Sequence, residues 1–433
     1  MLNLSPRAFV CAALSLNLSL LTACAEAPTQ TPASSVPASS ASRQPTPNAQ
    51  PSLPTSALSF ADWRNQLRDE ALAAGISPAL FDRAFTGITL DPAVLAADSS
   101  QPEFTRPIWE YLDGAVSASR IARGQTQQAQ QSATLKRIEQ RYGVQAETLV
   151  AIWGMESGYG SNIGSNSVIR SLATLAYEGR RQAFWRDQLL AALQILEHGD
   201  ITPERLIGSW AGAMGQTQFM PTTYNQHAVD FDGDGRRDLW SSPADALASA
   251  AHYLQASGWQ HGQPWGFEVR LPSGFDYALA DPERRISLAE WAALGVQPIN
   301  GAAPPALAGE SATLLLPTGH RGPAFLLMNN FRSILKYNNS SSYALAVGLL
   351  SDGIRGANSQ VVADWPRNDP QLGRSERIEL QELLATHGFN PGAADGIIGA
   401  NTRKAVRAYQ QTLKLPADGY PSHELLDALR SRL

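Results

Sequence analysis

The sequence predicts a mainly α-helical protein with a small β-containing insertion and a separate helical domain at the C-terminus. Apolar residues recur at helical spacing from the start of the ordered sequence, where Trp63, Leu67, Ala71 and Leu72 share a face before Gly75. Further helix-like runs cover about residues 106–123, 132–142, 146–156, 182–198, 244–257 and 341–350. Between about 262 and 328 Gly and Pro become frequent, and 267–271 alternates apolar and polar residues as strands do.

Length and composition are those of an ordinary globular protein. The chain has 433 residues, of which 43% are hydrophobic and 17% charged, and this length allows two or three domains. Its net charge is −5, so there is no electrostatic reason to expect nucleic acid as a partner.

The N-terminus resembles a secretory signal peptide. An apolar run, 8–23, follows Arg7 and is too short, and too interrupted by Asn17, to span a membrane comfortably. We therefore assign residues 1–23 as a signal peptide that is removed from the mature protein.

The end of this run resembles a bacterial lipobox. Leu21-Thr22-Ala23 precede Cys24, which the resemblance makes the lipidated first residue of the mature chain. Ala25 rather than Asp follows it, which implies an outer-membrane lipoprotein facing the periplasm. The alternative is an ordinary signal cleavage near Ala25, with Cys24 incidental.

Two stretches of low complexity divide the rest of the chain. Residues 24–57 are rich in Pro, Ser, Thr, Ala and Gln, so they cannot bury enough apolar surface to fold, and we expect a disordered tether. A second stretch, poor in apolar periodicity, predicts a linker at 357–372. It separates a domain at 58–356 from a final unit at 373–433. That unit contains two similar turns, 394–396 and 417–419, each after a helix-like run, which indicates an internal quasi-repeat.

One glutamate stands out as a candidate catalytic group. On a helix, Leu149, Ile152, Trp153 and Glu156 fall on one face, so a carboxyl group lies among apolar side chains before the glycines at 158 and 160. Partial desolvation disfavours the charged form and raises the pKa, as a general acid at neutral pH requires. A glutamate that simply reaches solvent at a helix end fits the pattern equally well.

Two further segments have the composition of a ligand-binding surface. Residues 208–221 are rich in Gly and small residues with interspersed amides and aromatics, which lets backbone approach a ligand and offers hydrogen bonds to hydroxyls. Residues 337–340 form a polar and aromatic cluster just before a helix. Either segment alone is equally consistent with a plain turn.

An acidic loop is a candidate calcium site. Asp230, Asp232, Asp234 and Asp238 stand at positions 1, 3, 5 and 9 of an EF-hand-like pattern with Gly at position 6, and Arg236 would contribute its carbonyl. Position 12 carries Ser241 instead of the bidentate Glu, and Asp245 is the candidate replacement. We expect calcium here in a structural role and with weaker affinity than a full loop; a charged Gly-rich turn is the alternative.

The segments ESGYG, GSWAGAMGQTQFMP and KYNNSSSYALAV together resemble the membrane-bound lytic murein transglycosylase B family. The opening FADWRNQLRDEALAAGIS and DSSQPEFTRPIWEYLDG are similar to the same family, so the resemblance covers about residues 58–356. It implies a lysozyme-like α-rich catalytic domain with Glu156 as the single acid and base. The cleft residues that it implies are Ser209, Gln218, Tyr253, Tyr337 and Asn338. The pair before Gln218 departs from the family pattern, and we assign Gln216 no role.

The resemblance implies cleavage of the bond between N-acetylmuramic acid and N-acetylglucosamine in peptidoglycan, with a 1,6-anhydro product and no cofactor for catalysis. Hydrolytic glycosidases usually need two carboxylates, whereas this reaction can use one. Glu178 and Asp187 lie nearby in the chain, so a hydrolytic muramidase is the second hypothesis. A non-catalytic wall-binding lipoprotein is the third.

The C-terminal unit carries DGIIGANTRKAVRAYQ at 395–410, which resembles the small peptidoglycan-binding domain, a three-helix module. Most of this signature is structural: Asp395-Gly396 forms a turn, Gly399 precedes a helix, and Val406 and Tyr409 face a core. The implied partners are peptidoglycan strands, the membrane through the lipid anchor, and cell-wall synthases or hydrolases.

Overall fold

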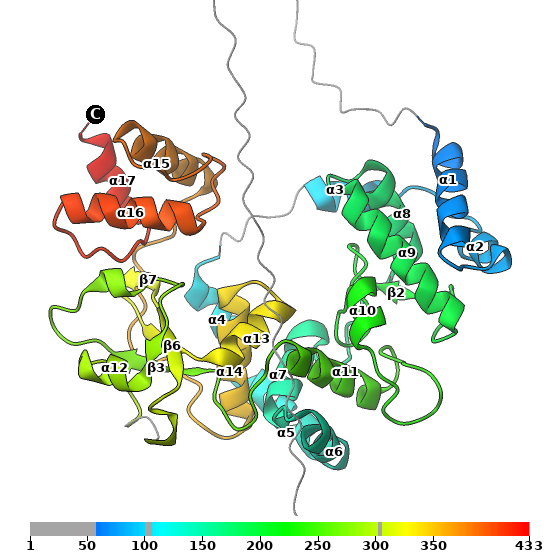
Figure 1. Ribbon diagram of the computed structural model, residues 1–433, viewed down its shortest axis with the longest axis horizontal. Helices are drawn as coiled ribbons and strands as arrows, with labels where there is room; N and C mark the ends of the chain where they lie inside the picture. The colour runs from blue at the N-terminus through cyan, green and yellow to red at the C-terminus, as the bar shows by residue number, and fades with distance from the viewer. Residues whose placement is uncertain (1–57, 100–105, 302–304, 433) are drawn as a thin grey trace, which may run out of the picture. The chain divides into compact units, whose positions relative to one another are not determined.

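The computed structural model describes residues 58–99, 106–301 and 305–432, and most of these residues are helical (Figure 1). The mainly α fold predicted from periodicity is therefore confirmed. None of the helices in the described ranges is long and apolar enough to cross a membrane. The predicted signal peptide, the candidate lipidation residue Cys24 and the predicted tether lie outside the described residues.

A first group of helices surrounds one apolar core. These helices are α1 (Phe60–Ala73), α2 (Pro78–Ala84), α3 (Pro92–Ser99), α8 (Val168–Glu178), α9 (Gln182–His198) and α10 (Pro221–His227). The face predicted for α1 is confirmed, because Trp63, Leu67 and Ala71 are buried in this core and Leu72 is half-buried. Gly75, in the left-handed region with φ +92°, follows the end of the helix as the pattern predicts.

A second group of helices encloses the other large core. Its members are α4 (Ile108–Ala115), α5 (Ala118–Gln130), α6 (Ser132–Tyr142), α7 (Ala146–Ser157), α11 (Pro243–Ala256), α13 (Asn329–Tyr337) and α14 (Ser341–Ile354). The helix-like run predicted over about 106–123 is largely helical but is interrupted. It is two helices, because Ser117 adopts an extended conformation and its hydroxyl caps α5 by accepting from the amide of Arg120.

The strand-like region is a small antiparallel sheet with its own core. The strands are β3 (Gly266–Arg270), β4 (Ile286–Ser287), β5 (Gln297–Pro298), β6 (Ser311–Leu315) and β8 (Ala324–Leu327), in the order β4-β6-β8-β3-β5. The fully buried Trp291, on helix α12 (Leu288–Ala293), fills the core beneath the sheet. Short elements complete the fold: β1 (Asn166–Ser167), β2 (Ile207–Gly208), β7 (Pro317–His320) and the 3-10 turns Tyr277–Leu279 and Pro305–Leu307. The predicted β-containing insertion is therefore present.

The C-terminal unit is a three-helix module of α15 (Arg374–Thr386), α16 (Ala400–Thr412) and α17 (His423–Arg430). Its predicted quasi-repeat has a physical basis, since a buried glutamine holds each turn. Gln381 accepts from the amide of Gly396 at 2.8 Å, and Gln410 accepts from the amide of Gly419 at 2.9 Å.

The segment predicted as a linker lies against the helical and sheet regions. The amides of Val362 and Ala363 both donate to the carboxylate of Glu268 on β3, each at 2.8 Å. Arg367 forms an ion pair with Asp113 on α4 at 3.0 Å. The low-complexity composition therefore did not indicate how closely this segment contacts the folded regions.

Candidate active site

Glu156 lies at the C-terminal end of α7, the helix at the centre of the second core. Every residue of α7 from Thr148 to Gly154 is buried, because α5, α6, α11 and α14 all pack against it. The sequence pattern, with one apolar face, therefore underestimated the burial. Gly158 ends the helix in the left-handed conformation with φ +57°, leaving the Glu156 side chain half-buried.

A tyrosine hydroxyl contacts the Glu156 carboxyl group. The Tyr343 phenol, near the start of α14, donates to Glu156 Oε1 at 2.5 Å. Burial raises the pKa of Glu156 to about 7, although this hydrogen bond opposes the shift. Burial and the nearby Glu156 charge also raise the pKa of Tyr343 well above its ordinary value, so the phenol keeps its proton and acts as donor.

Neither of the two acids considered as a partner for Glu156 among the described residues lies close enough to affect its pKa. Glu178, at the end of α8, and Asp187, on α9, are both exposed, and neither contributes to the pKa shift of Glu156. The groups that feel the Glu156 charge are the phenols of Tyr111, Tyr337 and Tyr343. The arrangement can therefore donate and take back a proton through one carboxyl group.

The Gly-rich segment 208–221 pairs with itself through β-bridges. Met214 makes β-bridges with Gly208 and Phe219, so the segment is a tight double turn. Gly215 has φ +66°, and a Cβ there would come within 2.7 Å of the Leu239 carbonyl oxygen. At this position glycine thus allows close approach to neighbouring backbone, whereas the composition of the segment predicted approach to a ligand.

Gln216, to which the sequence gave no role, ties this segment to α7. Its buried Oε1 accepts from the indole Nε1 of Trp153 at 2.9 Å, and its carbonyl accepts from the Ser157 hydroxyl at 2.8 Å. Its Nε2 also donates to the carbonyl of Trp240. Gln216 therefore holds the residues on either side of Glu156. The sequence signal that it offered was an amide side chain between Gly215 and Thr217, in a segment for which we expected approach to a ligand.

Ser209 and Gln218 also belong to the double turn. The Ser209 hydroxyl accepts from the amide of Ala213 at 3.0 Å. Gln218 has a positive φ of +50°, and its Nε2 donates to the Gly215 carbonyl at 2.9 Å. Both side chains shape the segment in this structure, and Gln218 is half-buried.

An aromatic cluster joins three segments that are distant in the sequence. The Tyr337 hydroxyl donates to the Thr217 carbonyl at 2.8 Å, and the Tyr253 hydroxyl donates to the Lys336 carbonyl at 2.7 Å. Both rings contact Phe219, each at 5.7 Å between ring centroids. The structure thus brings Tyr253 and Tyr337 together, while Asn338 lies exposed just after α13.

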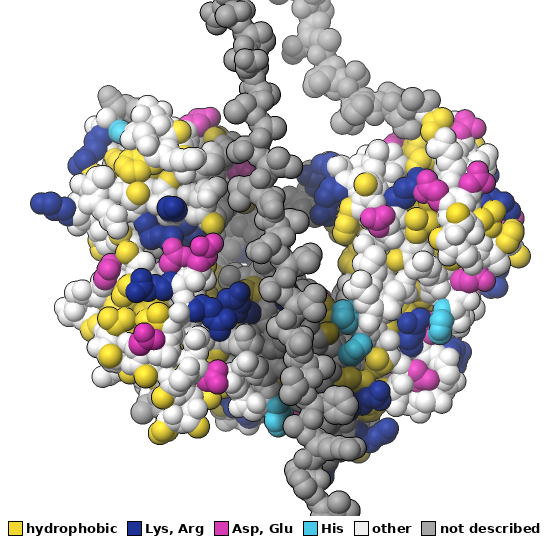
Figure 2. All heavy atoms as spheres, viewed as in Figure 1, with side chains coloured by type: hydrophobic (Ala, Val, Ile, Leu, Met, Phe, Trp, Pro, Cys, Tyr) yellow, Lys and Arg dark blue, Asp and Glu magenta, His cyan; other side chains and the backbone are white. Residues whose placement is uncertain are grey.

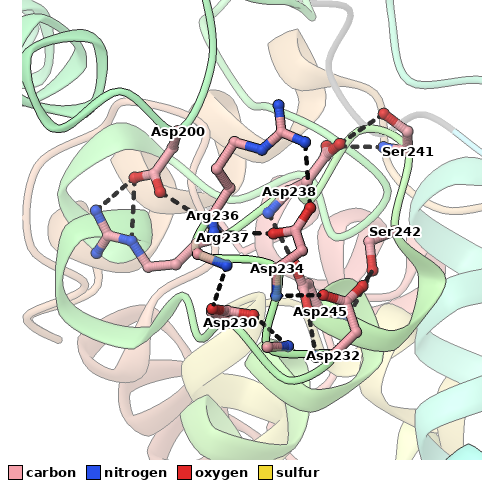
Figure 3. Close-up of polar contacts among 12 residues, drawn as sticks. Asp200, Asp230, Asp232, Asp234, Arg236, Arg237, Asp238, Ser241, Ser242 and Asp245 are labelled. Atoms are coloured by element: carbon pink, nitrogen blue, oxygen red, sulfur yellow. Dashed lines mark hydrogen bonds and ion pairs between the residues drawn. The ribbon is translucent and has the colours of Figure 1, made fainter.

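The acidic loop gathers three of its predicted ligands (Figure 3). Asp230, Asp232 and Asp245 each offer a carboxylate oxygen, and these oxygens lie within 4.8 Å of one another. Asp245 is fully buried and accepts from the amides of Phe231 and Asp238 at 2.8 and 2.9 Å. Burial raises its pKa to about 6, because three backbone hydrogen bonds do not offset the desolvation.

The other predicted ligands lie outside that group. Asp234 forms an ion pair with Arg236 at 3.2 Å, and Asp238 accepts from the Ser241 hydroxyl at 2.7 Å. Ser241, at position 12 of the pattern, therefore hydrogen-bonds to a neighbouring acid and does not join the cluster. Asp245, the candidate replacement for the glutamate at position 12, does lie in the cluster. A cluster of carboxylate oxygens of this kind is what Ca²⁺ prefers.

These features define a class of protein. A lysozyme-like helical domain, a half-buried carboxyl group with a raised pKa and an attached three-helix module are the attributes of an enzyme that cleaves glycans. Residues 59–352 match the family described as Transglycosylase SLT domain, and residues 373–429 match the peptidoglycan binding domain family. The chain belongs to the Transglycosylase SLT domain family, the lytic transglycosylases, which cleave peptidoglycan.

Solved structures of relatives agree with this assignment. SltB3 from Pseudomonas aeruginosa, in complex with NAG-anhNAM-pentapeptide, is 63% identical with a TM-score of 0.84, and the match covers 86% of this chain and 99% of that chain. The Escherichia coli lytic transglycosylase SLT35, in complex with calcium, is 30% identical with a TM-score of 0.58, covering 69% of this chain and 94% of that chain. The predicted family and lysozyme-like fold are confirmed.

A curated relative matches a smaller part of the chain. Membrane-bound lytic murein transglycosylase B of Escherichia coli strain K12 is 35% identical over 232 residues, which are 52% of this chain and 61% of that protein. The chain therefore spans about three fifths of the length of this relative.

The hydrogen bonds of Gln216 to Trp153 and Ser157 predict that Gln216 contributes to the free energy of unfolding. Gln216→Ala leaves the buried Trp153 indole N–H without its acceptor, so we expect the free energy of unfolding to fall by about 1–3 kcal/mol. Denaturant unfolding of the parent and the variant measures this change. Gln255→Ala, at an exposed position on α11, is the matched control. An equal fall in the free energy of unfolding of both variants would contradict the stabilising role of the Gln216 hydrogen bonds.

The raised pKa of Glu156 predicts a pH-dependent stability. Between about pH 4.5 and 7 the folded state binds more protons at Glu156 than the unfolded state, so stability falls as pH rises through this range. Glu156→Gln should remove this loss and melt at a higher temperature than the parent at pH 8, with little difference at pH 4. Glu178→Gln, at an exposed position, should follow the parent, and parallel curves for all three proteins would refute the prediction.

Proposed function

We propose that this protein is a lytic transglycosylase that cleaves the β-1,4 bond between N-acetylmuramic acid and N-acetylglucosamine in peptidoglycan, forming 1,6-anhydro-N-acetylmuramic acid for wall remodelling and turnover. The observation that carries the proposal is the single half-buried Glu156 carboxyl group, with a pKa of about 7 and a hydrogen bond from Tyr343. Family membership supports it, as does the resemblance to SltB3, which was solved with a peptidoglycan fragment.

In the first step Glu156 acts as an acid. With a pKa of about 7, a substantial fraction of the carboxyl group is protonated at neutral pH. It gives this proton to the glycosidic oxygen as the bond to the anomeric carbon breaks, and the N-acetylglucosamine leaves with a hydroxyl group. The N-acetyl group of the muramic acid supports the oxocarbenium-like centre that forms.

In the second step Glu156 acts as a base. The carboxylate takes the proton of the sugar's own 6-hydroxyl while that oxygen bonds to the anomeric carbon, which closes the anhydro ring and restores the acid. No water is consumed. The Tyr343 hydroxyl stabilises the carboxylate between the two steps, because its hydrogen bond favours the charged form.

The alternative of a hydrolytic muramidase is less well supported. Such an enzyme usually places a second carboxylate across the scissile bond, as nucleophile or as base for water. The exposed Glu178 and Asp187 do not contribute to the pKa shift of Glu156. A non-catalytic scaffold is also disfavoured, since the chain belongs to a family of enzymes that cleave peptidoglycan.

The organisation of the chain suits a tethered enzyme. We propose that the signal peptide 1–23 is removed, that Cys24 carries the lipid, and that 24–57 spans from the outer membrane to the wall on the periplasmic side. The catalytic domain at 58–356 and the wall-binding module at 373–433 would then follow, joined by 357–372. Cell-wall synthases or hydrolases are the protein partners that we expect in this setting.

A structural calcium ion completes the proposal. Asp230, Asp232 and Asp245 would hold it, and the charge of the ion would offset the cost of burying Asp245 beside Asp232. SLT35, a relative with a TM-score of 0.58, was solved in complex with calcium, which supports this assignment. Catalysis through Glu156 itself requires no cofactor.

The function is tested by digestion of purified sacculi. The parent should release muropeptides that are lighter by one water than reducing products, because the 6-hydroxyl replaces water. Glu156→Gln cannot donate a proton and should lower the rate about 10²- to 10⁴-fold. Mass spectrometry of the products and the initial rates give both results.

The exposed residues Glu178 and Asp187 provide the control variants for the digestion experiment. Glu178→Gln and Asp187→Asn should each retain the parent rate. Reducing muropeptides from the parent would establish hydrolysis instead of transglycosylation. Undiminished digestion by Glu156→Gln would remove Glu156 from the mechanism altogether.

Calcium should raise the melting temperature of metal-free protein. At a concentration about 100-fold above its dissociation constant, an ion that binds only the folded state adds about 2.7 kcal/mol of stability. Asp230→Asn should weaken this response, and Glu283→Gln, an exposed acid outside the loop, should keep it. A parent melting curve that calcium does not move would contradict the site.

A further inference from the structure

A cationic cavity of about 630 Å³ lies between the three-helix module and the domain that carries Glu156. Its cationic lining residues come from two helices: Arg332 and Lys336 from α13, and Arg403 and Arg407 from α16. Figure 2 shows Lys and Arg side chains gathered on this face over both helices. Leu315 and Leu327, at the ends of β6 and β8, form an apolar part of the wall.

Most of these cations lack an acidic partner. Arg407 pairs with Asp281 at 3.1 Å, but no described carboxylate forms an ion pair with Arg332, Lys336 or Arg403. Asp418 also lines the cavity, yet its carboxylate already accepts from His320 and from Gln410, each at 2.7 Å. The cavity therefore has an excess of positive charge.

Like charges in and beside the cavity also disfavour one another. The pKa of Arg403 is lowered by burial and by the neighbouring Arg407. The pKa of Arg285 is lowered by burial and by Arg332. A bound anion would relieve this repulsion, because each guanidinium would gain a charge-assisted hydrogen bond.

The cavity adjoins the candidate active site through the connection between α13 and α14. Asn339 and Ser341, which line the cavity, flank Ser340, whose hydroxyl caps the helix that carries Tyr343. Lys336 precedes Tyr337, and its carbonyl accepts the hydroxyl of Tyr253. A polymer held at Glu156 would thus have its nearby substituents close to these cations.

We propose that this cavity binds the free carboxylates of the peptide stems of peptidoglycan. The glycan backbone is uncharged wherever the lactyl group of muramic acid bears a stem, so the stems carry the negative charge that complements these arginines and lysine. The apolar wall suits the methyl groups of stem alanines. This inference rests on the proposed function, since it takes peptidoglycan as the substrate.

Binding to protein with the Glu156→Gln change tests the cavity without turnover. The ligands are a disaccharide–pentapeptide muropeptide, the same disaccharide without its peptide and with its lactyl carboxyl group amidated, and a muropeptide with amidated carboxyl groups. Calorimetry should show the first binding about tenfold more tightly than the other two, the factor that a charge-assisted hydrogen bond supplies. Adding Arg332→Ala and Arg403→Ala should abolish this preference and leave the affinity for the peptide-free disaccharide unchanged.

The matched control is Lys404→Ala, an exposed cation on α16 outside the cavity lining, which should keep the preference. Equal affinity for the three ligands, or a preference that survives the double change, would overturn the proposal. Sacculus digestion by the parent is scored separately. Anhydro products without a carboxylate preference would refute only the cavity, whereas a preference without any cleavage would refute only the proposed reaction.

Discussion

The burial of the Glu156 carboxyl group is the constraint on which the candidate site depends. Packing of α5, α6, α11 and α14 around α7 removes water from the helix, and this desolvation raises the pKa of Glu156 to about 7. The Tyr343 hydrogen bond then limits the shift, so that both protonation states are accessible near neutral pH. The same packing destabilises the fold whenever the carboxyl group is charged, because a buried charge loses its hydration.

Amide and hydroxyl groups hold the surroundings of Glu156 in place. Gln216 joins Trp153 and Ser157, on either side of the carboxyl group, to the double turn at 208–221. Tyr337 joins the same turn to α13 through the Thr217 carbonyl. Because these groups are buried and satisfied by specific partners, the site is preorganised by hydrogen bonds that would be expensive to leave unmade.

The three-helix module contacts the sheet region through one of its two turns. Gln381 and Gln410 stabilise its two related turns in the same way. The second turn has an additional contact, since Asp418 also accepts from His320 on β7. Arg403 and Arg407 of the same module line one cavity with residues of α13.

Local pattern in the sequence was sufficient for the helical class and the β-containing insertion, because periodicity and turn residues act over a few neighbouring positions. The three-helix module and the candidate role of Glu156 needed the resemblance to known families as well, since the local pattern around Glu156 also fits a solvent-exposed helix end. It missed the break at Ser117, the full burial of α7, and the roles of Gln216 and Tyr343, although Tyr343 stood in a motif as a hydroxyl on an apolar helix. The break at Ser117 is a local cap, made with an amide only three residues further on. The burial of α7 and the roles of Gln216 and Tyr343 depend instead on contacts between segments 59 to 187 residues apart, which only the tertiary structure brings together. The sequence determined which carboxyl group is available, and the fold decided its pKa and its partners, since desolvation is a property of packing.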